Sequence, residues 1–318
     1  MIFLIIFQVL RKLFLIIVFF FLSNNLLADT LKYKDLEKLS KKNTFVDDKG
    51  KNYSIDNIVD KNNTLLIIYN HGSGSDINLD SCSKNPSFGY IWKGAVVPAL
   101  LKLHNKKIKG LEIKIYRLCS GVKGMSLNNQ KKYRKQIKSK GKIDLVDEFK
   151  NIKRQNIILD QVDKLKNQGF KNIILAGYSA GGWASLNLQS RYPNIVKGAI
   201  AFNPAFAGPK KEWQKKYPEW GAFRAQQVDI FNKSENLNAI LFAHDKDIFE
   251  DPDTLSFFKK FKGINFIDYS ELKPSNCRWA DVDKKMGSSK GHEIPQSICF
   301  TNFIKDKNYL LNFLNEIF

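Results

Sequence analysis

The sequence predicts an α/β protein with a doubly wound, mostly parallel sheet and helices on both faces. Two observations lead to this prediction. Short apolar runs typical of buried strands alternate along the chain with longer segments of helical period. No internal repeat and no long Pro- or Ser-rich linker interrupts this alternation, so we expect one domain after a leader. In such sheets ligands bind beyond the carboxyl ends of the strands.

The predicted elements begin near residue 60. The strands are the apolar runs at 64–69, 111–116, 172–176, 197–202, 239–243 and 264–269. The helices are 90–104, 156–167, the segment that ends at Leu188, 255–261 and 303–318. The helix at 156–167 illustrates the pattern, because Ile158, Val162 and Leu165 fall on one face. An irregular, aromatic-rich segment at 205–235 separates two of the strands.

The first 28 residues have the composition of a secretory leader. They contain no acidic residue, and Arg11 and Lys12 precede an apolar run from Leu13 to Leu22. This run is too short to span a bilayer but suits the centre of a signal peptide. We therefore predict a signal peptide at 1–28, an N-terminal segment at 29–59, a main domain at 60–318, and a periplasmic or secreted location. An earlier apolar run before Arg11 leaves an uncleaved membrane anchor as the alternative.

Export changes how the cysteines are interpreted, because an oxidising compartment favours disulfides over free thiols and metal sites. The cysteines are Cys82, Cys119, Cys277 and Cys299, and their number leaves three pairings open. None has the close CxxC spacing of a metal site or redox pair. The sequence therefore predicts disulfides and neither a metal nor an organic cofactor.

The chain is strongly basic, with 51 Lys and Arg residues against 31 Asp and Glu residues and a net charge of +20. Such a charge attracts anionic surfaces and ligands, although a lysine-rich composition offers a second explanation. The densest patch, from Lys131 to Lys142, is interpreted as a solvated basic loop, with a specific anion site as the alternative. No nucleic-acid-binding motif is present, so we expect no nucleic-acid partner, and membrane contact only through the leader or the basic surface.

A serine motif follows the apolar run at 172–176. Gly177-Tyr178-Ser179-Ala180-Gly181 fits G-x-S-x-G and lies between a predicted strand and a predicted helix. A turn this sharp brings the flanking backbones together, so the positions two before and two after the serine cannot carry bulk. The helix that begins at Ala180 directs its free N–H groups towards the serine oxygen. The context favours Ser179 as a nucleophile over a small residue that fills a turn.

With this motif the chain resembles the α/β-hydrolase superfamily, most closely its esterase-like and dienelactone-hydrolase-like members, over about residues 60–318. The resemblance implies a serine, an acid and a histidine in that chain order. His292, preceded by Gly291, lies after the last predicted strand and matches the place of the general base. His244, at the end of the strand at 239–243, is interpreted as structural.

The same resemblance implies that the acid follows the strand at 239–243. Its usual spacing selects Asp247, but His244 stands where the family has a glycine, which leaves the register open. Asp245 is the first alternative, and Asp251 and Asp253 come behind it.

The resemblance also implies an oxyanion hole of two backbone N–H groups. One is expected from Ala180, and the other from the loop "NHGSGSD", with Ser73 as the first choice and Gly72 as the second. An ordinary glycine-rich turn is the alternative interpretation of this loop. The segment at 205–235 stands at the family's cap position, and its aromatic residues either line an apolar pocket or form a small core of their own.

The implied fold also favours the sequential disulfide pairing. It makes the strands at 64–69 and 111–116 neighbours, which suits a bridge between Cys82 and Cys119. Cys277 and Cys299 bracket His292, so a bridge between them would restrict the loop that carries the base. Closing a loop of this length lowers the free energy of folding by roughly 3 kcal/mol.

These features predict an exported serine hydrolase, most consistent with a carboxylic ester hydrolase that uses Ser179, His292 and Asp247 and forms an acyl-enzyme. The expected partner is a small-molecule ester, and the basic patch makes an anionic ester an option. A serine peptidase or amidase of the same fold is one alternative. A catalytically silent member that binds a ligand is another.

Overall fold

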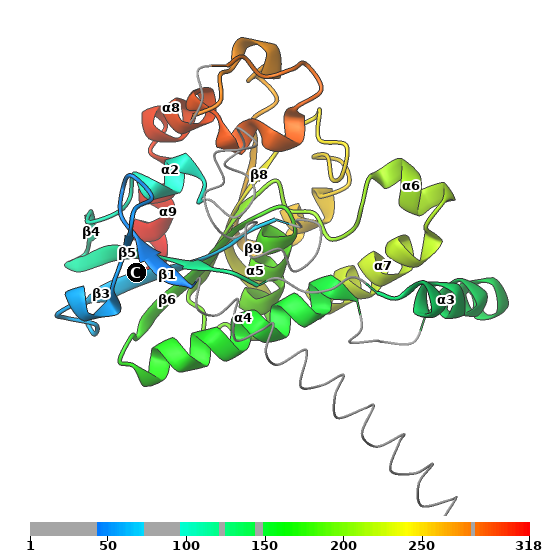
Figure 1. Cartoon of the computed structure of the whole chain (residues 1–318), viewed down its shortest axis with the longest axis horizontal. Coiled ribbons are helices and arrows are strands. Elements are labelled where there is room, and N and C mark those ends of the chain that lie inside the picture. Colours follow the sequence, from blue (N-terminus) through cyan, green and yellow to red (C-terminus); the bar gives the residue numbers. More distant parts are fainter. Residues whose placement is uncertain (1–42, 73–95, 121–124, 144–148, 281–283) are drawn as a thin grey trace, which may run out of the picture.

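The computed structural model describes residues 43–72, 96–120, 125–143, 149–280 and 284–318 (Figure 1). Its centre is a sheet of nine described strands in the order β2-β1-β5-β3-β6-β7-β8-β9, with β4 beside β5. The strands are β1 (Thr44–Val46), β2 (Asn52–Tyr53), β3 (Thr64–Asn70), β4 (Lys107–Ile108), β5 (Leu111–Leu118), β6 (Asn172–Tyr178), β7 (Gly198–Phe202), β8 (Asn236–Ala243) and β9 (Lys262–Asp268). All pairings from β5 to β9 are parallel. The predicted doubly wound, mostly parallel α/β sheet is confirmed.

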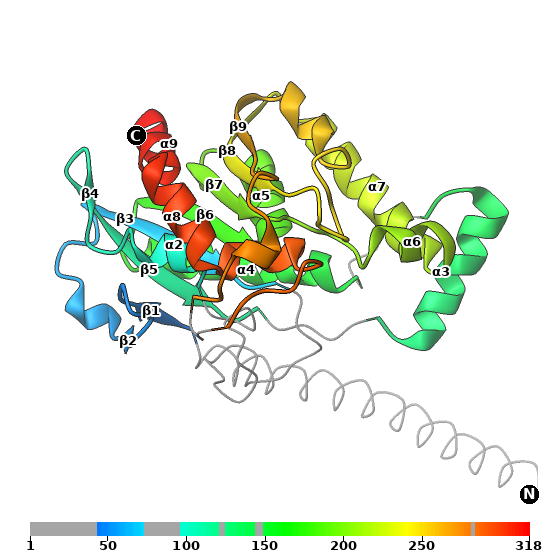
Figure 2. The same cartoon turned by 90° about the horizontal axis from the view of Figure 1, so that it is seen from above.

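Helices cover both faces of this sheet (Figure 2). They are α2 (Pro98–Leu101), α3 (Leu127–Lys140), α4 (Lys150–Asn167), α5 (Ala180–Arg191), α6 (Lys210–Lys215), α7 (Pro218–Asn232), α8 (Ile298–Asp306) and α9 (Tyr309–Ile317). The short 3-10 helices are η1 (Ile55–Asn57), η4 (Ser256–Lys260), η5 (Pro274–Asn276) and η6 (Gly291–Gln296). One apolar cluster joins α2, α8 and α9 to one face, and two clusters join α4, α5 and α7 to the other. β3 is therefore buried along its whole length, as parallel strands require.

Several predicted elements differ from the structure. Helix α4 begins at Lys150 rather than at 156, and the segment at 205–235, expected to be irregular, contains the helices α6 and α7. Within the described part of 90–104 the helix spans only Pro98–Leu101, because an extended residue precedes Pro98 and Asn105 turns the chain at φ 62°. The predicted helix at 303–318 is two helices, separated by Asn308 in a left-handed conformation at φ 52°. The segment at 255–261 forms a 3-10 helix, η4, in place of an α-helix.

The basic patch is a helix, and its interpretation as a loop was wrong. Helix α3 begins at a Ser126 cap, whose hydroxyl accepts the Asn129 N–H, and it ends at Gly141 in a left-handed conformation. The buried Tyr133 ring packs 5.5 Å from the Phe223 ring of α7. Tyr133 and Phe223 are far apart in the sequence, and their contact stabilises the helix. The many lysines of the segment hide its helical pattern in the sequence.

The amino-terminal part of the described chain extends the sheet. β1 pairs antiparallel with both β2 and β5, so residues 44–53 of the N-terminal segment form one sheet with the main domain. The predicted signal peptide at 1–28 lies outside the described residues. None of the described helices has the length and hydrophobicity needed to cross a membrane.

Candidate active site

Ser179 occupies a sharp turn between β6 and α5. Its backbone has φ 54° and ψ −122°, which residues with a side chain rarely adopt. The Ser179 N–H donates to the Phe202 carbonyl at 3.0 Å, and the Ser179 carbonyl accepts from the N–H of Ala205 at 3.1 Å. Such strain persists only where the surroundings enforce it, and it is common at catalytic residues.

Glycines make this turn sterically feasible. A Cβ atom on Gly177 would collide with the backbone of Gly181, and a Cβ atom on Gly181 would collide with the carbonyl of Asn70 at the end of β3. A Cβ atom on Gly182 would lie 2.9 Å from the Gly177 carbonyl oxygen. The steric demand expected from the sequence is present, and β3 contributes to it.

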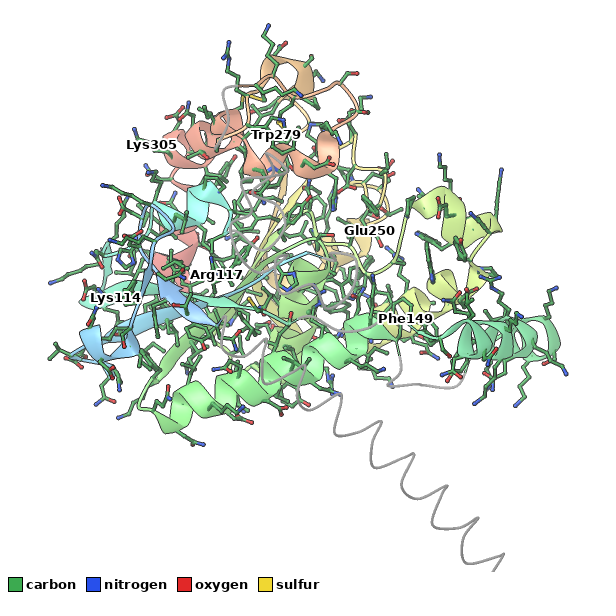
Figure 3. All side chains as sticks on the ribbon, viewed as in Figure 1. Lys114, Arg117, Phe149, Glu250, Trp279 and Lys305 are labelled. Carbon is green, nitrogen blue, oxygen red and sulfur yellow. A yellow bond between two sulfur atoms is a disulfide. The ribbon has the colours of Figure 1, made fainter. Side chains whose placement is uncertain are left out.

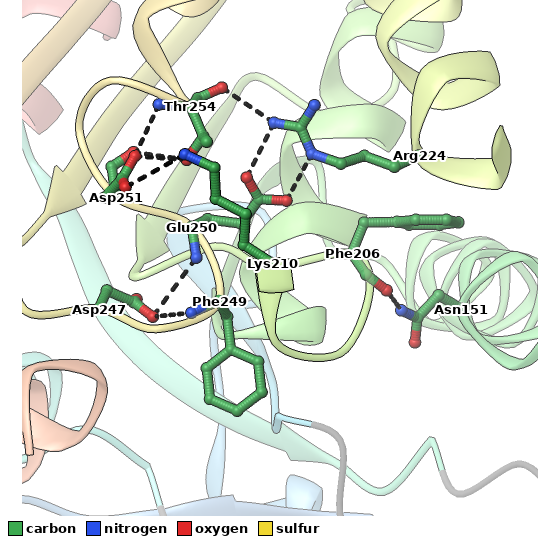
Figure 4. Close-up of polar contacts among 9 residues, drawn as sticks. All are labelled: Asn151, Phe206, Lys210, Arg224, Asp247, Phe249, Glu250, Asp251 and Thr254. Atoms are coloured by element: carbon green, nitrogen blue, oxygen red, sulfur yellow. Dashed lines mark hydrogen bonds and ion pairs between the residues drawn. The ribbon is translucent and has the colours of Figure 1, made fainter. Parts of the chain in front are cut away.

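The structure brings His292 and Asp247 together. His292 Nδ1 lies 2.6 Å from Asp247 Oδ2, and the Asp247 side chain is fully buried. The other carboxylate oxygen, Oδ1, accepts the Phe249 N–H at 2.8 Å and so orients the carboxylate (Figure 4). A carboxylate at Nδ1 holds the proton of a neutral imidazole on that nitrogen, which leaves Nε2 as the proton acceptor.

The alternative acids have other surroundings. The Asp245 side chain is 41% exposed, and its carboxylate lies beside His244 rather than His292. Asp251 accepts two hydrogen bonds from the turn that follows it (Figure 4). In the described part of the chain, Asp247 is the acid of this loop that contacts His292.

Ser179 and His292 line one cavity of about 460 Å³. Its apolar wall consists of Met125, Phe149, Tyr178, Ala205, Phe206, Ala207, Trp220 and Phe249. Its polar side chains, apart from Ser179 and His292, are Gln130, Lys150, Glu219 and Glu293. Phe206 and Trp220 of the segment at 205–235 line the cavity. Phe223 is fully buried, but in a cluster shared with α4, α5 and the sheet, so the segment does not form a separate core of its own.

Buried polar residues that the sequence analysis missed hold the backbone of His292. Asn203 Nδ2 donates to the carbonyls of Gly291 and His292 at 3.0 and 2.9 Å, and the Tyr178 hydroxyl donates to the His292 carbonyl at 3.0 Å. The Tyr269 hydroxyl donates to Asn203 Oδ1 at 2.6 Å. Asn203 directly follows β7 at the carboxyl edge of the sheet, and this position is the signal that could have identified it.

Both tyrosines remain hydrogen-bond donors at any working pH. Burial raises the pKa of Tyr178 well above its usual value, and the negative charges of Glu293 and Asp247 raise it further. Burial and the charge of Asp247 likewise raise the pKa of Tyr269. Tyr178 and Tyr269 therefore stay protonated and donate within the network around His292.

The segment that follows β3 lies close to Ser179. A Cβ atom on Gly72 would lie 3.1 Å from Ser179 Cβ, so the Gly72 backbone lies against the serine. The Arg154 guanidinium donates to the His71 carbonyl at 2.6 Å, and His71 Nδ1 bonds the Gly72 carbonyl at 2.6 Å. Ala180 begins α5, where N–H groups have no acceptor within the helix. Ser73 lies outside the described residues.

His244 has a structural role, as the sequence analysis proposed. Its ring is fully buried, its Nδ1 accepts the Lys246 N–H at 3.0 Å, and its Nε2 bonds the Leu272 carbonyl at 2.8 Å. Both ring nitrogens are thereby occupied in holding the loop that leads to Asp247.

One predicted disulfide is present. Cys277 and Cys299 are bonded, with Cα atoms 5.4 Å apart, and they bracket the segment that carries His292. Cys119 is buried at the end of the β5 region, and its predicted partner Cys82 lies outside the described residues.

A buried ion pair ties helix α7 to the loop that carries Asp247 (Figure 4). Arg224 donates to both carboxylate oxygens of Glu250 at 2.6 and 2.8 Å and to the Thr254 carbonyl at 2.9 Å. The exposed fractions of the two side chains are 13% and 1%. Burial raises the pKa of Glu250, whereas the charge of Arg224 opposes that rise. Glu250 also donates its N–H towards Asp247 Oδ1 at 3.4 Å, so the pair supports the acid.

Similar proteins are found among the solved structures. No protein-family model matches the chain, and no curated protein matches it. Among solved structures it is similar to a monoacylglycerol lipase of Paleococcus ferrophilus, at 13% identity and a TM-score of 0.40, covering 71% of this chain and 86% of that one. It is also similar to Est1E of Butyrivibrio proteoclasticus, at 13% identity and a TM-score of 0.42, covering 85% and 98%. It is also similar to the esterase Pf2001 of Pyrococcus furiosus, at 12% identity and a TM-score of 0.41, covering 80% of this chain and 84% of that one.

The chain's own topology and contacts agree with the resemblance to the α/β-hydrolase superfamily. Ser179 lies between strand β6 and helix α5, and Asp247 and His292 follow it along the chain in that order. The resemblance implies both of these features. No group of three or more His, Cys, Asp or Glu side chains in the described ranges is arranged to hold a metal ion.

Replacement of Gly181 by alanine should destabilise the fold. The new Cβ atom would collide with the Asn70 backbone, which cannot move aside as a flexible side chain can. We expect the free energy of unfolding in urea to fall by about 3 kcal/mol or more. Gly287→Ala is the matched control, since its Cβ atom would come no closer than 3.7 Å to another residue. Equal stability of the two variants would contradict the packing described for the turn.

Replacement of Arg224 by methionine should cost about 3–5 kcal/mol, because it leaves the buried Glu250 carboxylate without its partner. Without Arg224 the pKa of Glu250 rises further above its unfolded value. The folded state then binds the proton more tightly, so stability is retained at acid pH and lost as the pH rises through the folded pKa. Urea unfolding of Arg224→Met at acid and alkaline pH measures this loss.

The double variant Arg224→Met with Glu250→Gln removes the titrating carboxyl and should show no such dependence on pH. The same loss at every pH in the single variant would show that Arg224 acts through packing alone.

Proposed function

We propose that the protein is an exported serine hydrolase and, more specifically, a carboxylic ester hydrolase. The observation that carries this proposal is the hydrogen bond between His292 and Asp247 beside a cavity that Ser179 also lines, with Ser179 on a strained turn. A serine hydroxyl is a weak nucleophile at neutral pH and needs a base that an acid orients. These three residues supply the nucleophile, the base and the acid.

In the proposed reaction, Ser179 Oγ attacks the ester carbonyl carbon while His292 Nε2 takes the hydroxyl proton. Asp247 stabilises the imidazolium that forms, since its carboxylate lies at Nδ1. The carbonyl oxygen becomes an anion, to which the N–H groups of Ala180 and of Ser73 or Gly72 donate.

Collapse of the tetrahedral intermediate breaks the bond to the alkoxy group, which leaves as the alcohol with the proton from His292. Water then attacks the acyl-serine, with His292 as its base, and releases the acid together with the free serine. The cycle needs no group beyond these residues and water.

The substrate class follows from the size and lining of the cavity. A volume of about 460 Å³ accommodates a small-molecule ester. Aromatic side chains of the 205–235 segment, Phe206 and Trp220, form part of its wall, and an apolar acyl or aryl group would pack against them.

Export is the second part of the proposal. The leader at 1–28 motivates it, and the disulfide between Cys277 and Cys299 supports it, because such bonds persist in oxidising compartments.

A fluorophosphonate probe should label the folded protein, because it reacts with an activated serine. Ser179→Ala should abolish labelling, whereas Ser256→Ala, which changes an exposed serine in η4, should leave it intact. A panel of p-nitrophenyl esters of rising chain length, with the matching anilides, then separates esterase from amidase activity. Labelling that survives Ser179→Ala would overturn the assignment of the nucleophile.

Asp247→Asn should lower kcat on a p-nitrophenyl ester by about 10⁴-fold, since an amide can impose the wrong imidazole tautomer. Asp245→Asn should retain activity close to wild type, because the exposed Asp245 carboxylate lies beside His244. Steady-state kinetics on the two variants measure this contrast. A larger loss with Asp245→Asn than with Asp247→Asn would assign the acid to Asp245.

A further inference from the structure

Helix α3 carries a row of lysines on its solvent side. Lys131, Lys135 and Lys138 follow one another at helical spacing, so they share one face, and all three are exposed. Leu127 lies one turn earlier on the same face and is 73% exposed. We call these four residues the lysine face.

The opposite side of α3 attaches the helix to the molecule. Tyr133 is buried against α7, and Ile137 packs on the same apolar cluster. Arg134 donates to both carboxylate oxygens of Glu219 in α7, each at 3.0 Å from Nε. Helix α3 therefore lies at the outer margin of the molecule, and Figure 3 shows long side chains that extend from it into solvent.

Positive charge on this helix is segregated. Helix α3 contains no acidic residue, and none of the ion pairs among the described residues involves the lysine face. The surface helix α4 differs, because its exposed Lys164 and Lys166 stand beside the exposed Asp160 and Asp163. A lysine-rich composition accounts for lysines on both helices but not for the absence of acids from α3.

We propose that the lysine face docks onto an anionic lipid bilayer. A row of ammonium groups is complementary to a surface of lipid phosphates, and an apolar residue beside such a row is typical of helices that lie at a membrane interface. Leu127 supplies this apolar contact. A helix face that contacts only water needs no such residue.

The lysine face lies next to the active-site cavity. Gln130 of α3 and Met125, just before the helix, line that cavity, and Arg134 holds Glu219 in its wall. Docking would therefore bring the cavity wall close to the bilayer. The proposal that the lysine face binds a bilayer does not depend on hydrolysis. Only its corollary, that the substrate is an ester carried in the lipid, rests on the proposed function.

Co-sedimentation with vesicles tests the inference. The protein is purified after export, as the cell processes it, with Ser179→Ala present so that no lipid is hydrolysed. We expect it to bind phosphatidylcholine vesicles that contain phosphatidylglycerol, and to release them as salt is raised to about 0.5 M, because screening weakens the attraction. The variant with Lys131→Gln, Lys135→Gln and Lys138→Gln should bind about 100-fold more weakly, at roughly fivefold per lysine.

The matched control replaces Lys164, Lys166 and Lys171 by glutamine, which removes the same charge near the amino end of β6, away from Ser179. It should bind the anionic vesicles nearly as well as the parent. Equal losses in the two triple variants would show that net charge alone is responsible and would overturn the inference. Binding to an acidic polysaccharide but not to vesicles would also overturn it.

The failure of this inference and the failure of the proposed function are distinguishable. Both lysine triple variants, made with Ser179 intact, should hydrolyse a soluble p-nitrophenyl ester at the parental rate if the protein is an esterase. Binding is measured without catalysis, so an inactive protein that binds vesicles leaves the docking inference standing.

Discussion

The contact between the Ser179 turn and the end of β3 is the constraint around which the site is built. Gly181 packs so closely on the Asn70 carbonyl that a Cβ atom on Gly181 would collide with it. This contact holds Ser179 in its strained conformation and places Gly72 against it. Ser179 and Gly72 are therefore positioned by one backbone contact between neighbouring parallel strands.

His292 is positioned differently, by a network of polar side chains from several strands. Asn203 and Tyr178 donate to the backbone of the His292 segment, Tyr269 donates to Asn203 Oδ1, and Asp247 contacts the His292 ring. Each buried polar group in this network finds a partner, as the low dielectric of the interior demands. The pair of Arg224 and Glu250 extends the support to α7, so the helix that borders the cavity and the loop that carries the acid are mechanically linked.

Elements are predictable from the sequence where periodicity and steric demand are local. The strands β3, β5, β6, β7, β8 and β9 and the turn at Ser179 lie close to their predicted positions, because each is defined by a few adjacent residues. The short strand β4 and the elements that a distant contact decides were not predicted. Helix α3 is stabilised by the packing of Tyr133 on Phe223. The predicted last helix divides into α8 and α9 at Asn308, and no periodic pattern in the sequence reveals the left-handed backbone of that residue.

The sequence by itself determined the class of fold and the serine with its turn, whereas the pairing of Cys277 with Cys299 was favoured only through the fold that the resemblance implies. Only the tertiary structure decided that Asp247 rather than Asp245 contacts His292, and that Asn203 and two tyrosines support it. In an irregular loop no period relates chain position to side-chain direction. The contact depends on how two segments 45 residues apart pack against the same edge of the sheet.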